Sequence, residues 1–275
     1  MDKIAVIILN YKTWKETLEE VETVHKVCGV NYKNIIIIDN NSQNESVEKF
    51  KEDSSKGYKL LISKENCGYA AGNNIGLKYA FEQGYKYAWI LNNDIIIEDK
   101  NVLNKMVGIF KKDEQIAVVN PDIYDPNGYM FNRDSKRPNI FDLTVGAVGY
   151  KKRGRAIVDL GGYGYVYRPQ GCCMLLDLYK VQQIGYMDEK TFLYCEEIIL
   201  AERLRKGGYK SANLLNARVI HNHSKTVKTY IQKKQLQKIK LKSFSYYLKN
   251  YRSYNQLEIK ICSLFYRIKL LVLGE

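Results

Sequence analysis

The strongest strand signal in the chain is the segment Tyr87-Ala88-Trp89-Ile90-Leu91-Asn92-Asn93-Asp94-Ile95-Ile96-Ile97-Glu98. Its apolar run is too short to cross a bilayer and is typical of a strand that is buried on both faces. The polar residues Asn92 to Asp94 would emerge at the carboxyl end of that strand, where open α/β sheets bind their ligands. The alternative interpretation is an Asx-rich turn that ends a core strand.

The segments before it repeat the pattern of a buried strand followed by a helix. Strands are predicted over residues 4–9, 35–38 and 58–62, helices over 13–27 and 45–53, and a loop over 66–74 that leads into a helix ending near residue 83. This alternation predicts a parallel sheet with right-handed crossovers. The strands end in or near Asn10, Asp39, Asn66 and Asp94. Four polar ends at one edge of one sheet favour a ligand site over a simple turn.

The later half is predicted from weaker signals. Helices are expected over residues 99–112, 178–184 and 196–206, and strands over 116–119, 172–176 and 212–220. Pro121 is expected to close the strand at 116–119. Residues 122–164 are expected to be irregular, as binding loops often are, and to face an acceptor. The last of these strands ends at His221-Asn222-His223, and helices are expected beyond residue 226.

The net charge of +13 is concentrated in the C-terminal tail. Residues 221–275 contain twelve Lys and Arg but only Glu258 and Glu275 as acidic residues, so they carry +10 of that charge. Residues 233–273 interleave basic with apolar and aromatic side chains, a pattern typical of an amphipathic helix at an anionic membrane surface. A helix that docks on the catalytic domain is the alternative. No known nucleic-acid motif occurs, and no nucleic-acid partner is expected.

Several function classes and compartments are disfavoured. No Gly-x-Gly-x-x-Gly follows the first strand and no Gly-Lys-Ser/Thr occurs, which argues against a dinucleotide fold and a P-loop. No Cys-x-x-Cys pair suggests a zinc knuckle or a disulfide framework. Met1 leads directly into a strand-like segment, so no secretory signal is expected. We expect a cytoplasmic protein, associated with the inner face of the cell membrane; its oligomeric state is left open.

The predicted strand ends offer ligands for a divalent cation. Asp94, Asn92 and Asp39 supply oxygen, and a histidine at the end of a later strand supplies nitrogen. Such a set suits Mg²⁺ or, with the nitrogen ligand, Mn²⁺. A cation held by few protein groups usually takes its remaining ligands from substrate phosphates. The pattern therefore indicates a diphosphate leaving group.

Eight motifs in order give the chain a family resemblance. They are Ile8-Leu9-Asn10-Tyr11, Asp39-Asn40-Asn41-Ser42, Asn66 to Gly76, Leu91-Asn92-Asn93-Asp94, Gly171 to Leu175, Gly185 to Glu189, Phe192 to Glu197 and Val219-Ile220-His221. With them the chain resembles glycosyltransferase family 2 enzymes of the GT-A fold, particularly bacterial rhamnosyltransferase-like members. The resemblance implies an α/β fold, a Rossmann-like mixed sheet flanked by helices. It implies a catalytic domain over residues 1–225, to which 226–275 adds a basic amphipathic helical tail.

The resemblance also implies a role for each motif. Nucleotide-sugar contacts are implied for Asn10, Asp39, Ser42, Asn66, Gly68, Gly72, Asn73 and Asn93. Metal or diphosphate contacts are implied for Asp94, Asn92 and His221, with Mn²⁺ or Mg²⁺ as cofactor. Glu197 is the implied general base, beside Glu196; a charge pair favoured by a helix N-terminus is the alternative for both. Gly171 and Asp188 are expected on the acceptor side, although Asp188 could instead cap a turn.

Two departures from the family pattern bear on activity. Asn92 stands where relatives carry an aspartate, which leaves the metal site with one charge fewer. Ile199 stands where many relatives carry a second carboxylate after the base. The implied function is a metal-dependent inverting transfer from a dTDP- or UDP-linked sugar to a hydroxyl of a glycan or lipid-linked acceptor, in cell-surface polysaccharide synthesis. The alternative is a catalytically inactive nucleotide-sugar-binding partner subunit.

Overall fold

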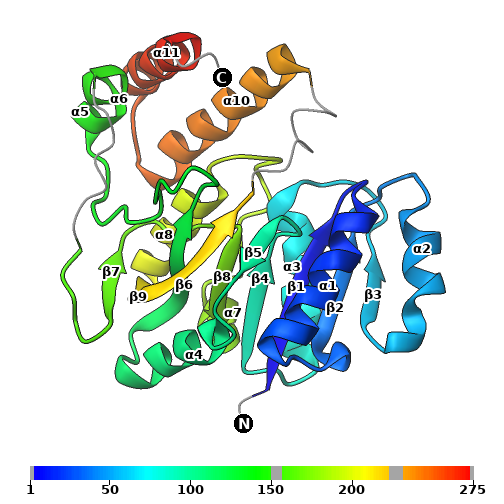
Figure 1. Ribbon diagram of the computed structural model, residues 1–275. Helices are drawn as coiled ribbons and strands as arrows, with labels where there is room; N and C mark the ends of the chain where they lie inside the picture. The colour runs from blue at the N-terminus through cyan, green and yellow to red at the C-terminus, as the bar shows by residue number, and fades with distance from the viewer. Residues whose placement is uncertain (1–2, 150–156, 223–231, 273–275) are drawn as a thin grey trace.

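The computed structural model describes residues 3–149, 157–222 and 232–272. In these residues one nine-stranded sheet has the order β3-β2-β1-β4-β8-β6-β9-β5, and β7 pairs with β9 (Figure 1). The strands are β1 (Ile4–Asn10), β2 (Ile35–Asp39), β3 (Lys59–Ile62), β4 (Tyr87–Leu91), β5 (Ile95–Ile97), β6 (Ile116–Tyr124), β7 (Tyr163–Val166), β8 (Cys173–Asp177) and β9 (Lys210–His221). The helices are α1 (Trp14–Cys28), α2 (Ser46–Glu52), α3 (Tyr69–Glu82), α4 (Val102–Lys112), α5 (Ile140–Leu143), α6 (Val145–Gly149), α7 (Leu178–Gln183), α8 (Glu196–Lys206), α10 (Lys233–Tyr251) and α11 (Gln256–Val272).

The N-terminal half of the sheet is parallel, as predicted. β1 pairs with β2 and β4, and β2 pairs with β3, all in parallel. Helices cover both faces: α1, α2 and α4 pack on one and α3, α7 and α8 on the other. In β4 Trp89 faces the first layer and Ile90 the second. Two covered faces explain why these strands are apolar at every position.

The C-terminal half makes the sheet mixed. β8 lies antiparallel between β4 and β6, β9 runs parallel to β6, and β5 runs antiparallel to β9. The chain leaves β4 at Leu91, where its polar end was predicted, and continues as β5 at the far end of the sheet path, a second strand that the sequence analysis did not predict. Asn92, Asn93 and Asp94 form the connection, since consecutive polar side chains do not suit a strand buried on both faces.

Two other element boundaries differ from the prediction. β6 continues through Pro121 to Tyr124, with a register shift against β9 between Pro121 and Asp122. A proline without an N–H is tolerated at such an irregularity. The predicted loop over 66–74 is helical from Tyr69 onward. Gly72 lies in that helix, where a Cβ would come within 2.6 Å of the Leu9 side chain, so close helix–sheet packing explains the glycine.

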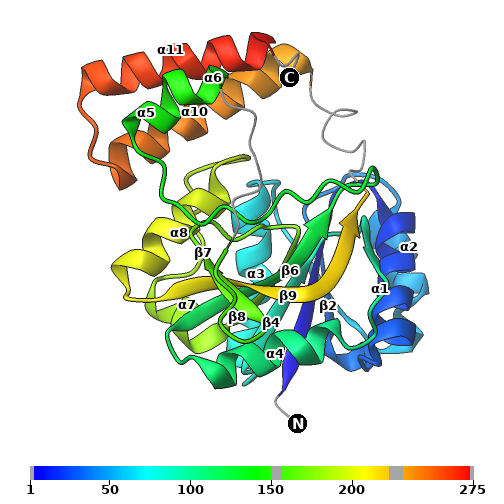
Figure 2. The same cartoon turned by 60° about the vertical axis from the view of Figure 1, so that its left-hand side comes forward.

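The four helices α5, α6, α10 and α11 pack as a unit, which lies at the end of the molecule opposite the N-terminus (Figure 1). Figure 2 shows α11 outermost, with α5 and α6 beside it and α10 between it and the sheet. α10 packs on α8 through a cluster that includes Ile199, Phe244 and Tyr247. Within the expected irregular segment 122–164 the described residues form α5, α6 and the start of β7. The division at residue 225 stays a prediction, and His223 lies outside the described residues.

Candidate active site

The ends of β1 and β2 hold a buried carboxylate. Asn10 and Asp39 are the last residues of these strands and are register partners. Asp39 is 1% exposed; its Oδ1 accepts hydrogen bonds from Asn10 Nδ2 at 2.7 Å and Ser42 Oγ at 2.6 Å, and its Oδ2 accepts from the Ser42 N–H at 3.0 Å. The structure thus brings together three residues that were predicted to bind the nucleotide.

A buried hydroxyl links this carboxylate to the turn after β4. Thr17 Oγ1 donates to Asn10 Oδ1 at 2.9 Å and accepts from Asn93 Nδ2 at 2.8 Å. Asn93 Nδ2 also donates to Thr13 Oγ1 at 2.8 Å. The amide of Asn93, predicted to contact the nucleotide-sugar, therefore points to α1. The sequence prediction missed Thr17, although its helical spacing from Val21 and Val24 places it on the inner face of α1.

The start of α3 packs tightly against neighbouring backbone. Asn66 Oδ1 accepts from Asn40 Nδ2 and from the Gly68 N–H, both at 3.0 Å. Gly68 has φ +94°, and a Cβ there would lie 1.9 Å from the Phe192 carbonyl oxygen. Asn73 is fully buried, and its Nδ2 donates to the Tyr69 carbonyl at 3.0 Å. In this structure Gly68 and Asn73 thus serve the packing of α3; a contact with the nucleotide-sugar stays a prediction.

The predicted metal ligands meet through strand pairing. β5 and β9 place His221 opposite Ile95, the residue after Asp94. His221 Nε2 lies 3.2 Å from Asp94 Oδ1, and both side chains keep a small exposed fraction, 13% and 10%. Asn92 lies in the same turn, and its N–H donates to the Cys172 carbonyl at 2.8 Å.

These residues fit a divalent cation held by few protein groups. Asp94 and His221 offer adjacent oxygen and nitrogen donors, the set predicted for Mn²⁺. Among the described residues no group of three or more His, Cys, Asp or Glu side chains could hold a metal. The cation would therefore take other ligands from Asn92 and from a substrate diphosphate.

A second buried carboxyl group lies near this turn. Glu20, on the inner face of α1, is 5% exposed. Burial and, after it, the negative charge of Asp94 raise the pKa of Glu20 well above its usual range. The sequence prediction missed Glu20, although it shares the inner face of α1 with Thr17.

The candidate base lies at the start of α8. Glu197 is half-buried, and its Oε1 accepts from Gln170 Nε2 at 3.0 Å and from the Gly171 N–H at 3.2 Å. The Gly171 carbonyl accepts from Tyr69 Oη at 2.7 Å, and a Cβ at Gly171 would lie 3.0 Å from that hydroxyl. Gly171, predicted on the acceptor side, therefore orients the carboxylate of Glu197.

The neighbouring Glu196 has a different environment. It is 7% exposed, and burial, followed by the charge of Glu197, raises its pKa to about 8. Tyr194 and Cys195, which lead into α8, both adopt left-handed backbone conformations with φ of 71° and 68°. Two such residues in a row are costly and cluster at functional sites. After this turn the two adjacent carboxyl groups have different surroundings, since Glu196 is buried and Glu197 is half-buried.

Asp188 contacts the C-terminal helix. Its Oδ2 accepts from Tyr246 Oη at 2.8 Å and from Tyr251 Oη, both on α10. Its Oδ1 accepts from the Lys190 N–H at 2.8 Å, the turn cap that was the alternative interpretation. Burial opposes the ionised form, but these hydrogen bonds outweigh it and lower the pKa of Asp188. A contact between Asp188 and an acceptor stays a prediction.

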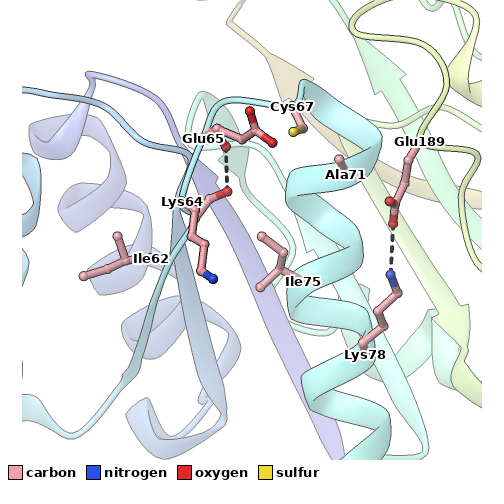
Figure 3. Close-up of a pocket in the computed structure, with 9 residues that line it drawn as sticks. Ile62, Lys64, Glu65, Cys67, Ala71, Ile75, Lys78 and Glu189 are labelled. Atoms are coloured by element: carbon pink, nitrogen blue, oxygen red, sulfur yellow. Dashed lines mark hydrogen bonds and ion pairs between the residues drawn. The ribbon is translucent and has the colours of Figure 1, made fainter.

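An open groove lies beside α3, outside this set of residues (Figure 3). Lys78 Nζ and Glu189 Oε1 form an ion pair of 3.0 Å at one side of it. Its lining comprises Ile62, Ser63, Lys64, Glu65, Cys67, Ala71, Ile75, Lys78 and Glu189. None of the predicted site residues is among the residues that line the groove.

The chain is similar in sequence or fold to several known glycosyltransferases. The hexosyltransferase Agl10 of low-salt glycan biosynthesis in Haloferax volcanii is 24% identical over 227 residues, which cover 81% of this chain and 68% of that protein. GalNAc-T7, solved with UDP, GalNAc and Mn²⁺, superposes with a TM-score of 0.65 at 16% identity over 92% of this chain, which spans only 49% of that protein. The mannosyltransferase PcManGT of Pyrobaculum calidifontis, solved with GDP-Man and Mn²⁺, gives 0.58 at 10% identity, over 99% and 75% of the two chains.

These structural likenesses confirm the predicted fold, a mixed GT-A sheet flanked by helices. The sequence model of glycosyl transferase family 2 matches residues 5–176, more than half of the chain. That range contains all of β1 but its first residue, β2 to β4, the Asn92 to Asp94 turn and Gly171. The chain therefore belongs to glycosyl transferase family 2.

Proposed function

We propose that this glycosyltransferase catalyses metal-dependent transfer of a sugar from a nucleotide diphosphate donor to an acceptor hydroxyl, with inversion. One observation carries the proposal. The Gly171 N–H donates to the carboxylate of Glu197, and the carbonyl of the next residue, Cys172, accepts from the Asn92 N–H. One dipeptide thus ties the candidate base to the turn that carries Asp94. A base and a diphosphate-binding group held side by side are what a displacement at a sugar carbon needs.

The proposed chemistry is a single displacement. Glu197 takes the proton from the acceptor hydroxyl, whose oxygen forms a bond to the anomeric carbon as the bond from that carbon to the diphosphate oxygen breaks. General base catalysis of this kind contributes about 10²–10⁴-fold. One displacement inverts the anomeric configuration. Gln170 and Gly171 hold the carboxylate of Glu197 in a fixed direction for the proton transfer.

The donor would lie along the carboxyl ends of β1, β2 and β4. Asp39, held by Asn10 and Ser42, would bind the base and ribose. Asp94, His221 and Asn92 would hold Mn²⁺ or Mg²⁺. The metal, when bound, neutralises negative charge on the departing diphosphate.

For the donor and the acceptor we propose chemical classes rather than particular molecules. The solved relatives contain UDP and GDP-mannose, and Agl10 is a hexosyltransferase, which supports a nucleotide-hexose donor. We propose a dTDP- or UDP-linked sugar such as rhamnose, and a glycan or lipid-linked acceptor in cell-surface polysaccharide synthesis. The reaction would occur at the cytoplasmic face of the membrane, which the basic segment 233–273 would contact.

The alternative, an inactive nucleotide-sugar-binding subunit, was raised by Asn92 and Ile199. Ile199 is fully buried against α10, in the cluster with Phe244 and Tyr247. A carboxylate at that position would be buried among apolar side chains, so its absence follows from the packing of α10. Because packing accounts for Ile199, this departure from the family pattern is no argument for an inactive subunit, and we favour the active enzyme.

The test is turnover of a panel of nucleotide-sugars with Mn²⁺ and candidate acceptors. We expect transfer by the wild type and its loss in Asp94→Ala and in Glu197→Gln, with Glu114→Gln as a surface control. NMR of the product anomeric centre should show inversion. Binding of donor without turnover by the wild type would favour the inactive subunit, and a product of retained configuration would exclude the single displacement.

A further inference from the structure

The sequence suggested that α10 offers an amphipathic face to a membrane, but α10 uses that face inside the protein. Leu236, Phe244, Tyr247 and Leu248 are all less than 9% exposed. Phe244, Tyr247 and Leu248 pack in one cluster with Ile199 of α8 and Cys262 of α11. Ser243 Oγ, on α10, donates to the Leu193 carbonyl at 2.7 Å. The apolar side of α10 is therefore not available to a lipid surface.

α11 has the opposite arrangement. Its inner side chains Cys262 and Leu270 are buried, whereas an apolar row on the other side faces solvent. That row, which we call the α11 outer stripe, consists of Leu257, Ile261, Leu264, Ile268 and Leu271, which are 66%, 39%, 57%, 37% and 74% exposed. The spacing of four and three residues places all five on one helical face.

Two helices that contact α11 carry exposed apolar side chains of their own. α5 and α6 lie beside α11 in both views (Figures 1 and 2). Ile140, Phe141 and Val145 of these helices are 41%, 59% and 54% exposed. Single exposed apolar residues are ordinary on protein surfaces, but a row of five on one helical face marks an interaction site.

The charge around the stripe identifies the kind of partner. Lys260 and Arg267 of α11 and Lys242 and Lys249 of α10 are exposed. Between residues 232 and 272 Glu258 is the single acidic residue. An apolar stripe flanked by basic side chains suits an anionic lipid interface, whereas two copies joined through this face would bring like charges together.

We propose that the α11 outer stripe and Phe141 dock in the interface of an anionic phospholipid membrane, with α11 lying in the membrane plane. Lys260 and Arg267 then contact lipid phosphates while the apolar side chains enter the acyl boundary. Among the described residues no helix combines the length and hydropathy needed for a membrane span.

Docking through this surface would also orient the candidate active site relative to the membrane. The four-helix unit lies at the end of the molecule opposite the N-terminus (Figure 1). The carboxyl ends of β1 and β4 point to this same end. Membrane docking through α11 would bring this end, with Asp94, close to the lipid surface. A lipid-linked acceptor could then present its hydroxyl without leaving the membrane. This role in acceptor delivery rests on the proposed function, whereas membrane docking itself does not.

The experiment is flotation of the full chain with vesicles of equal parts phosphatidylglycerol and phosphatidylcholine at low salt. We expect wild-type protein to float with these vesicles and to bind phosphatidylcholine alone, or at high salt, more weakly. Leu257→Asp/Leu264→Asp/Leu271→Asp should weaken binding by about tenfold or more. Tyr179→Asp, a replacement of a 64% exposed side chain on α7, should bind like the wild type.

Two further measurements keep the result decisive. Lys260→Glu/Arg267→Glu leaves the apolar packing intact and should also reduce flotation, even if the triple variant folds poorly. Light scattering on the wild type and the triple variant tests whether the stripe joins two copies of the chain. We expect no dimer that depends on the stripe; a wild-type dimer that the triple variant loses would assign the stripe to a second copy and overturn the proposal. Wild-type protein that does not float, or a folded triple variant that floats equally, would overturn it as well. Asp94→Ala should still float, which separates docking from catalysis.

Discussion

Thr17 Oγ1 accepts a 2.8 Å hydrogen bond from the side-chain amide of Asn93 and donates one of 2.9 Å to Asn10 Oδ1. Thr17 is fully buried. Asn10 in turn donates to the Asp39 carboxylate. One hydroxyl on α1 therefore connects the turn that carries Asp94 with the carboxylate at the end of β2.

Replacement of the Thr17 hydroxyl should weaken the positioning of both Asn93 and Asn10. Thr17→Val keeps the shape but removes the hydroxyl that donates to the buried Asn10 Oδ1 and one of the acceptors of the Asn93 amide, which should lower the free energy of unfolding by about 1–3 kcal/mol. We also expect a rise in the Mn²⁺ concentration needed for half-maximal activity, since Asn93 adjoins Asp94. Urea unfolding and metal titration measure the two effects. Thr17→Ser, which retains the hydroxyl, is the control; equal behaviour of Val and Ser would refute the link.

Glu196 should make the protein less stable as the pH rises. Its pKa is raised from 4.5 to about 8 in the folded state, so between these values the folded protein keeps a proton that the unfolded chain releases. Glu196 therefore does not lower the free energy of unfolding below pH 4.5, and it lowers that free energy by its full amount above pH 8. Glu196→Gln should therefore melt like the wild type at pH 4.5 and at a higher temperature at pH 9. Glu114→Gln is the exposed control, and a pH-independent difference would contradict this assignment.

Gly171 should be intolerant of even one methyl group. A Cβ there would lie 3.0 Å from Tyr69 Oη and 3.4 Å from Glu197 Oε1, so Gly171→Ala should move the candidate base. We expect kcat to fall by about tenfold or more, because small displacements of a catalytic group are costly. Gly108→Ala in α4 is the matched control, since no atom lies within 4 Å of its Cβ. That variant should keep its activity and gain about 0.5–1 kcal/mol in stability.

Asp188 should hold α10 against the catalytic domain in a pH-dependent way. Its pKa is lowered in the folded state, so its contribution to stability is present above the unfolded value of 3.8 and is lost as the pH falls through the lower folded value. Tyr246→Phe/Tyr251→Phe removes both hydroxyl donors and should speed limited proteolysis between α8 and α10. Tyr179→Phe, on the distant α7, should leave the cleavage rate unchanged. If the double variant is cleaved no faster than wild type, Asp188 does not anchor α10.

Local patterns in the sequence were enough to predict much of the fold. The unbroken apolar runs of β1, β2 and β4 required a strand with both faces covered, and their polar ends located Asn10, Asp39 and Asp94 at one edge. The order of the motifs then indicated the family. Boundaries that depend on packing were missed, such as the start of α3 at Tyr69, where helix and strand come close enough to require Gly72.

Tertiary structure alone decided how these residues are used. The pairing of β5 with β9 brings His221 to Asp94, and hydrogen bonds to Thr13 and Thr17 hold the amide of Asn93 against α1. α10 and α11 are both basic and amphipathic in sequence, yet α10 packs its apolar face on α8 while α11 exposes the outer stripe. The spacing of residues determines which side of an element is apolar; only contacts between distant segments decide what that side meets.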